Sequence, residues 1–208
     1  MENVMKQVEG GVCAAKGFSA NGLNCGLNPN KEKNDLALIY SEKMCNAAAV
    51  YTTNKVKGAP ILVTKKNLAA SGNHAQAVIA NSKNANTCNA DGEEKATKMC
   101  ALAAEQLGIS ADNMIVASTG VIGQVLPIEP IETHIEQLAK GLAPEHHDRA
   151  ANAIMTTDTF PKEYAVTFTA GGKKCTIGGM AKGSGMIHPN MATTLNFVTT
   201  DAAISTDL

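Results

Sequence analysis

The chain has 208 residues, of which 44% are hydrophobic and 18% charged, a balance typical of a globular protein with one core of good size or two small ones. Its formal net charge of -1 is spread over interspersed Lys, Glu and Asp without a basic block, so charge gives no indication of binding to nucleic acid or to an anionic membrane. No apolar run approaches the roughly 18 to 20 residues of a membrane span, and the N-terminus lacks the features of a secretion signal. We therefore expect a cytoplasmic protein.

The cysteines and histidines show no spacing typical of a disulfide framework or a metal site. Six cysteines are scattered without a CxxC pair, and the five histidines include one adjacent pair, His146 and His147. Adjacent side chains on a helix point about 100° apart, which makes joint metal ligation awkward. We expect reduced, structural thiols and no bound metal.

In the first part of the chain, the sequence predicts strands. Residues 36–43 and 46–54 alternate between apolar and polar, and the short Met44-Cys45 connection suggests a hairpin. Another apolar run covers 75–80, and the asparagines that follow it predict a loop.

Helical patterns dominate the middle of the chain. Asp91 and Glu94 form a potential capping box before a helix that runs to Leu107, and Gly108 stands where a left-handed residue is favoured. Its predicted buried face is a stripe at three-four spacing: Ala96, Met99, Cys100, Ala103 and Leu107. After a short buried strand at 114–120, a second helix is expected from Pro130, with Ile131, Ile135, Leu138 and Leu142 on one stripe, and a third over 145–155.

The last part of the chain alternates again. Residues 163–180 predict a hairpin around Gly171-Gly172, with Tyr164, Val166 and Phe168 on one face. A final strand contains Leu195, Phe197 and Val198. No internal repeat or linker divides the chain, and the small, aliphatic core suits close-packed α/β layers.

Between these strands lies a glycine-rich stretch with Gly178, Gly179, Gly183 and Gly185. It suggests a phosphate cradle, but Lys182 precedes Gly183 instead of following it as in the Walker pattern. The dinucleotide fingerprint also fails, because it opens a helix whereas this stretch leads to Pro189 and a strand. Nucleotide binding is therefore not favoured.

The same stretch fits a different chemistry, in which a hydroxyl nucleophile is made by breaking the chain. A threonine at a new N-terminus carries its own general base, because an α-amine has a pKa of about 8 and can accept the hydroxyl proton. The break requires attack on the preceding carbonyl, which a small residue and an unusual loop conformation favour. Ala192-Thr193 meets both conditions. The residues alone favour a simpler interpretation, in which Thr193 and Thr194 are β-branched residues at the start of a strand, where such threonines are common.

Acyl transfer also requires hydrogen-bond donors for an oxyanion and a group that binds the substrate. Thr119 and Gly120, at the end of a short strand, could supply donors at a turn, although structural turns ending in glycine are far commoner. Thr156 belongs to a hydroxyl cluster that would equally cap a helix end. Lys182 could hold a substrate carboxylate, but a lone lysine is usually solvated.

Three blocks together, STGVIG (118–123), MTTDT (155–159) and GGMAKGSGMIHPNMATTL (178–195), resemble the ornithine acetyltransferase family, also called glutamate N-acetyltransferase or ArgJ. The similarity extends from GVCAAKGFSANG near the N-terminus to the end of the chain. The resemblance implies an α/β fold of layered sheets and helices, like that of the self-processing aminopeptidases, and incomplete in this chain. It also implies self-cleavage of the Ala192-Thr193 bond, which divides the chain into an α-chain, 1–192, and the beginning of a β-chain, 193–208.

The resemblance assigns roles to particular residues. Thr193 would be the nucleophile, Thr119 and Gly120 the oxyanion hole, and Thr156 and Lys182 substrate-binding residues beside Thr193. The implied reaction moves acetyl from N-acetylornithine to Thr193 and then to glutamate, within arginine biosynthesis. It needs no metal or bound organic cofactor, and some members also accept acetyl-CoA as donor.

Two departures from the family pattern stand out. Thr194 occupies a place where members often carry Met. Family members also continue well past the position of Leu208, and this remaining C-terminal segment would supply further substrate-binding groups in an assembly of two α and two β chains.

Two other function classes remain open at this stage. A self-processing aminopeptidase or amidase would hydrolyse an amide, although its processing motif normally exposes serine and not the threonine found here. A non-catalytic derivative of the enzyme would bind substrate without turnover.

Overall fold

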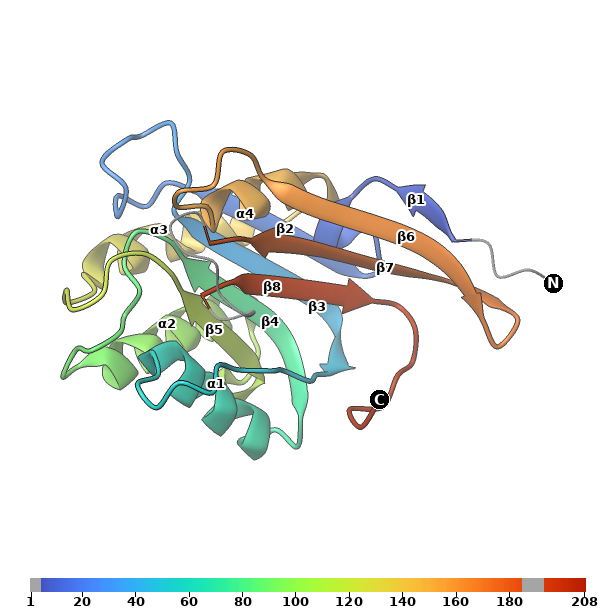
Figure 1. Cartoon of the computed structure of the whole chain (residues 1–208), viewed down its shortest axis with the longest axis horizontal. Coiled ribbons are helices and arrows are strands. Elements are labelled where there is room, and N and C mark those ends of the chain that lie inside the picture. The colour runs from blue at the N-terminus through green and yellow to red at the C-terminus, as the bar shows by residue number, and fades with distance from the viewer. Residues whose placement is uncertain (1–4, 185–192) are drawn as a thin grey trace.

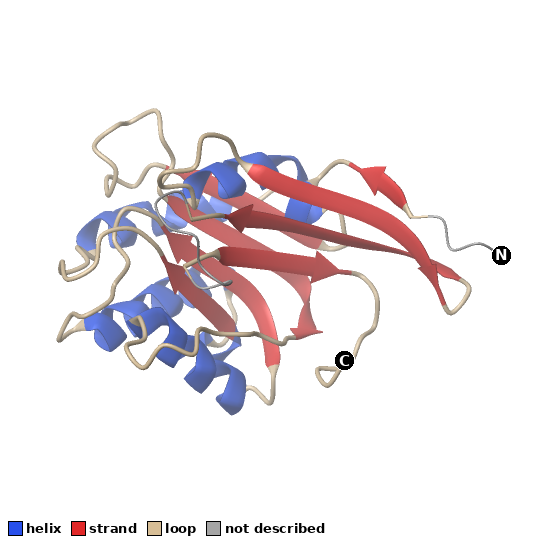
Figure 2. Ribbon diagram, viewed as in Figure 1, coloured by secondary structure: helices blue, strands red, loops and turns tan. Residues whose placement is uncertain are grey.

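The computed structural model describes residues 5–184 and 193–208. Over these residues the chain forms two four-stranded sheets, four α-helices and three short 3-10 helices, so it belongs to the mixed α/β class that the sequence predicts. Figure 2 shows the helices gathered toward one end of the long axis, while the strands of one sheet extend toward the other end.

The first sheet has strand order β2-β3-β4-β5 and is covered on one face by helices (Figure 1). Its strands are β2 (Phe18–Leu23), β3 (Leu36–Asn46), β4 (His74–Asn81) and β5 (Met114–Ser118), of which β4 and β5 are parallel and the other neighbours antiparallel. The covering helices are α1 (Ala59–Ala70), α2 (Gly92–Leu107) and α3 (Glu129–Lys140). Leu38, Ile79, Met99 and Leu138, all fully buried, belong to the core between them.

The second sheet has strand order β1-β6-β7-β8 and is antiparallel throughout. Its strands are β1 (Lys6–Val8), β6 (Lys162–Ala170), β7 (Lys173–Lys182) and β8 (Leu195–Thr200). A second core between the two sheets includes small residues of α4 (His147–Ala153), with Ile39 from one sheet and Met180 from the other. A Cβ on Gly178 would lie 1.9 Å from the carbonyl oxygen of Gly11, so β7 approaches the short helix Gly11–Cys13 too closely for a side chain.

Helix α1 protects the outer edge of β5, which pairs with a strand on one side only. The Thr64 hydroxyl donates to the Val116 carbonyl at 2.9 Å and accepts from the Val116 N–H at 3.0 Å, and the Asn67 amide donates to the Met114 carbonyl at 2.9 Å. Side chains of a helix therefore complete the hydrogen bonds of an edge strand.

Most predicted helices are confirmed. Helix α2 ends at Leu107, and Gly108 is left-handed with φ 65°. Four residues of its predicted stripe are buried, while Leu107 is partly buried. The capping box is wrong, since Asp91 makes no side-chain cap and its buried Oδ1 has no hydrogen-bond partner among the described residues. Helix α3 and the short helix α4 also fall where the sequence places them, although α3 ends before Leu142.

The predicted hairpin over residues 36–54 is wrong. Strand β3 continues through Met44-Cys45, where the sequence predicted a connection, and its pairing with β4 shifts register between Tyr40 and Cys45. Residues 47–54 form no strand because most of them are exposed and have no sheet to pair with. The partners of β3 are instead β2 and β4.

The hairpin at Gly171-Gly172 is confirmed, with φ of 57° and 74° at the two glycines. Tyr164, Val166 and Phe168 share a face, but the buried face of β6 is the opposite one, with Ala165 and Thr167. Strand β8 is confirmed as predicted.

All six cysteines are free thiols in the structure, as expected. Among the described helices, none combines the length and the apolar character needed to cross a membrane.

Candidate active site

The C-terminal end of β7 carries Lys182 on the buried face of its sheet. Gly178, Met180 and Lys182 alternate as the buried residues of this strand, so the lysine side chain points toward the inter-sheet core. Lys182 pairs in register with Leu195, the first residue of β8. Since Thr193 lies two residues before Leu195, the candidate nucleophile and Lys182 are at the same end of the same strand pair.

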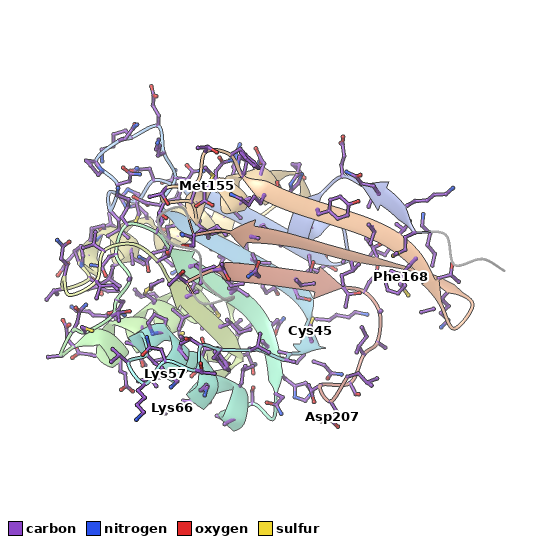
Figure 3. The ribbon with its side chains drawn as sticks, viewed as in Figure 1. Cys45, Lys57, Lys66, Met155, Phe168 and Asp207 are labelled. Carbon is purple, nitrogen blue, oxygen red and sulfur yellow. The ribbon has the colours of Figure 1, made fainter. Side chains whose placement is uncertain are left out.

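Asp158 connects the loop after α4 to this strand end. Its Oδ1 accepts from Lys162 Nζ at 2.7 Å and from the Gly183 N–H at 2.9 Å, and its Oδ2 accepts from the Thr156 N–H at 3.3 Å. Lys182 Nζ lies 4.0 Å from Oδ2. The structure thus brings the Thr156 backbone and Lys182 to the same carboxylate, for which the sequence predicts no role. Figure 3 shows Met155, which directly precedes Thr156, near the start of β6, whereas Phe168 lies far away on the β6–β7 hairpin.

The electrostatics of this cluster follow from burial and from opposite charges. Burial by itself raises the pKa of the Asp158 carboxyl, but hydrogen bonds from Lys162 and from two backbone N–H groups outweigh it and leave that pKa below its usual value. Burial lowers the pKa of the Lys182 ammonium, Asp158 partly opposes this effect, and Lys162 adds to it. Lys182 is therefore a buried ammonium that gains from a nearby anion.

The turn after β5 requires glycine at position 120. Gly120 has φ 133°, and a Cβ there would lie 2.2 Å from the carbonyl carbon of Lys83 and 2.6 Å from the backbone nitrogen of Asn84. The Thr119 N–H donates to the Asn81 carbonyl at 3.0 Å, so its hydroxyl is the group left to act as a donor. Gly120 is an exposed residue, and within the part of the chain that the structure describes its N–H makes no hydrogen bond.

A network of buried amides fixes this turn. Ser118 Oγ donates to Asn81 Oδ1 at 2.6 Å, and Asn81 Nδ2 donates to the Asn84 carbonyl at 2.9 Å. Asn84 Nδ2 in turn donates to the Gln124 carbonyl at 3.1 Å. Asn81 is fully buried and Asn84 nearly so. The sequence predicts only a loop at these asparagines, but their side chains fix the candidate oxyanion turn through hydrogen bonds.

Strand β5, which leads into this turn, contributes to the same inter-sheet core as β7 and β8. Ala117 of β5 and Met180 of β7 belong to the same apolar cluster, against which Leu195 packs. Thr119 directly follows β5, two residues after Ala117. Along the long axis of Figure 1, the end of β5, the end of β7 and the start of β8 all lie toward the same end of the molecule.

Thr193 has an unusual backbone conformation. Its φ is 64°, in the left-handed region that a β-branched residue rarely adopts. The residue is exposed, whereas Thr194 is partly buried. Ala192, the other half of the predicted cleavage site, lies outside the described residues.

The side chains of His146 and His147 contact different partners. His147 Nδ1 lies 3.0 Å from Glu163 Oε1, and His146 Nδ1 lies 2.8 Å from the Gly141 carbonyl. Within residues 5–184 and 193–208, no group of three or more His, Cys, Asp or Glu residues is arranged to hold a metal ion.

A family model described as the ArgJ family matches residues 19–208. The chain belongs to the ArgJ family. Among curated relatives, it is 52% identical over 202 residues to the "Arginine biosynthesis bifunctional protein ArgJ" of Symbiobacterium thermophilum. The aligned region covers 96% of this chain and 50% of the relative. The protein of the same name from Listeria monocytogenes is 47% identical, covering 98% of this chain and 50% of the relative. The chain thus spans about half the length of the curated ArgJ proteins it matches.

Two solved structures support the same assignment. A crystal structure of ArgJ from Bacillus halodurans superposes with a TM-score of 0.83 at 42% identity, over 92% of this chain and 100% of the crystallised one. Ornithine acetyltransferase from Mycobacterium tuberculosis, crystallised with ornithine, superposes with a TM-score of 0.80 at 33% identity, over 90% and 99% of the two chains. The fold described above is therefore the ArgJ fold.

Proposed function

We propose that the full-length protein is an acetyltransferase of arginine biosynthesis, which transfers acetyl from N-acetylornithine to glutamate through an acetyl ester on Thr193. The observation that carries this proposal is the pairing of β7 with β8, in which the buried Lys182 stands opposite Leu195, two residues after Thr193. The turn that requires glycine at position 120 supports it. The names of the relatives support it, because they are enzymes of arginine biosynthesis and one binds ornithine.

The reactive threonine would first be generated by self-cleavage. The Thr193 hydroxyl attacks the Ala192 carbonyl carbon, the C–N bond breaks, and the resulting ester is hydrolysed by water. The products are an Ala192 carboxylate and a free α-amine on Thr193. The positive φ of Thr193 supports this step, since such a conformation costs about 1 to 2 kcal/mol for an L-residue and no longer exists once the preceding peptide bond is gone.

Acetyl transfer would then use the new amine as base. Thr193 Oγ attacks the acetyl carbonyl of N-acetylornithine while its α-amine accepts the hydroxyl proton. The Thr119 hydroxyl and the Gly120 N–H stabilise the oxyanion, and one such donor is worth about 10² to 10³ in rate. Ornithine leaves with the proton, and the glutamate amine attacks the acetyl ester to give N-acetylglutamate. Lys182, with Thr156 beside it, binds the α-carboxylate common to both substrates.

This mechanism uses no metal and no bound organic cofactor, and acetyl-CoA would enter only as an alternative acetyl donor. Residues 1–192 would form the α-chain, and a β-chain beginning at Thr193 would include the C-terminal segment present in the longer relatives, in an assembly of two α and two β chains. The crystallised Bacillus halodurans chain is fully covered by this one, so it too has about half the length of the curated relatives, which supports such a division.

Mass spectrometry of the full-length protein tests the proposal, with the neighbouring hydroxyl as matched control. Wild type and Thr194→Ala are expected as two pieces divided between residues 192 and 193, and Thr193→Ala as one intact chain. During turnover with labelled N-acetylornithine, the label is expected on Thr193 Oγ. An uncleaved wild type that transfers acetyl, or label on another side chain, would refute the mechanism. Release of free acetate in place of transfer would instead identify an amidase, and binding without turnover a non-catalytic protein.

A further inference from the structure

Asp158 is a buried carboxylate placed between two lysines at the end of β7. Its side chain is 3% exposed, that of Lys182 is 6% exposed, and that of Lys162 is 37% exposed. The cluster therefore contains one negative and two positive groups, and one positive charge remains after the carboxylate is neutralised. A largely buried site with this balance of charges favours the binding of an anion at Lys182.

The hydrogen bonds of Asp158 divide the two lysines into different roles. Lys162 donates directly to Oδ1 at 2.7 Å and is the close counter-ion. Lys182 stays 4.0 Å from Oδ2 and donates instead to the Gly183 carbonyl at 2.7 Å. An ammonium has three donors, and within the described residues Lys182 uses one of them in a hydrogen bond. Lys182 is thus held near Asp158 without being fully paired to it.

Asp158 has little capacity left for chemistry of its own. Its oxygens accept from one ammonium and from the N–H groups of Gly183 and Thr156, and both backbone groups belong to segments that carry proposed substrate-binding residues. A carboxylate in this position orders its neighbours and does not exchange protons with a substrate.

We propose that Asp158 is a positioning residue, which holds the Lys182 ammonium and the Thr156 loop in place to receive a substrate α-carboxylate, while Lys162 supplies the compensating charge. The inference deepens the proposed function and rests on it. It implies that Asp158 and Lys162 have opposite effects on the pKa of the Lys182 ammonium, and these opposite effects provide the test.

The signs follow from the charges that face Lys182. Among the described residues, its charged neighbours are Asp158, which raises the pKa of the ammonium, and Lys162, which lowers it. Asp158→Asn preserves the shape of the side chain and removes its charge, so Lys182 loses its proton at lower pH. Lys162→Met removes a repulsive charge, so Lys182 keeps its proton to higher pH. Substrate binding is lost on the alkaline side when Lys182 becomes neutral.

The experiment measures the dissociation constant of N-acetylglutamate by calorimetry on the full-length protein, from neutral to alkaline pH. The acylated amine of this probe does not titrate in that range. We expect Asp158→Asn to weaken binding about tenfold or more at pH 8, since the carboxylate that accepts from Lys162, Gly183 and Thr156 is lost, and to move the alkaline loss of binding to lower pH. Lys162→Met should move it to higher pH.

A matched control is Glu136→Gln. Glu136 and Lys140 are also an acid and a lysine four residues apart, but both are exposed and lie on α3, so this variant should bind like wild type. The inference would be overturned if Asp158→Asn and Lys162→Met moved the pH at which binding is lost in the same direction, or if neither variant moved it. It would also be overturned if the wild type did not bind N-acetylglutamate. If the wild type transfers acetyl through Thr193 and the variants show no shift, only the role of Asp158 fails. If the wild type binds the probe with the expected shifts but transfers no acetyl, only the proposed function fails.

Discussion

Replacing Gly120 by alanine should damage both the stability and the activity of the full-length protein. The backbone at φ 133° lies in a region that L-residues rarely adopt, at a cost of about 1 to 3 kcal/mol. The new Cβ would also lie 2.2 Å from the Lys83 carbonyl carbon, a backbone atom held in the sheet-end network, and relieving such overpacking costs about another 1 to 3 kcal/mol. We expect the free energy of unfolding to fall by about 2 to 6 kcal/mol.

Gly123 is the matched control, because it lies in the same loop with φ 77°, and a Cβ added there would have no heavy atom within 4 Å. Gly123→Ala should therefore cost only the conformational strain of about 1 to 2 kcal/mol. Urea unfolding followed by circular dichroism gives the two stabilities, and kcat for acetyl transfer should fall at least about a hundredfold in Gly120→Ala alone, through displacement of the Gly120 N–H. Equal stability and equal kcat in the two variants would refute the described turn.

Two further predictions concern the supporting structure. Thr64→Val should lower the free energy of unfolding by about 2 kcal/mol or more, because it leaves the N–H and the carbonyl of Val116 without their partner at the edge of β5, and urea unfolding would contradict this if the loss were below about 0.5 kcal/mol. Iodoacetamide at pH 8 should label the exposed Cys88 but not Cys100, because burial raises the pKa of the Cys100 thiol to about 12, and mass spectrometry showing equal labelling in the native protein would be inconsistent with that burial.

The sequence predicted well those elements whose local residue pattern alone specifies the conformation that they adopt in the fold. The α2 stripe and the Gly171-Gly172 hairpin fall in this class, since their apolar spacing or turn residues already contain the structural information. Helix α1 received no assignment, because its buried face includes the polar Thr64 and Asn67, which serve the edge of β5 and interrupt the apolar stripe. Only the position of a neighbouring strand explains these two residues.

Strand β2 also could not be predicted from its local sequence. Its sequence FSANGL contains Asn and Gly, residues of low strand preference, and it is extended because it pairs with β3 from Phe18 to Leu23. In the candidate site, Lys182 and Thr193 were found through a motif. Asp158 also lies in a quoted block, MTTDT, but its role, like that of Asn81, depends on contacts between segments distant in sequence. Such contacts leave no spacing that a single sequence reveals.

The pairing of β7 with β8 bears on how a cleaved protein would behave. Six residues of β8, Leu195–Thr200, are in register with Ile177–Lys182, and Leu195 and Phe197 anchor the strand in the inter-sheet core. A break ahead of Thr193 would leave this ladder intact, so the two polypeptides would migrate as a single particle in gel filtration and separate only in detergent or denaturant. Self-processing in this fold would then leave the size of the native particle unchanged, and the newly formed amine would remain next to the strand pair from which it came.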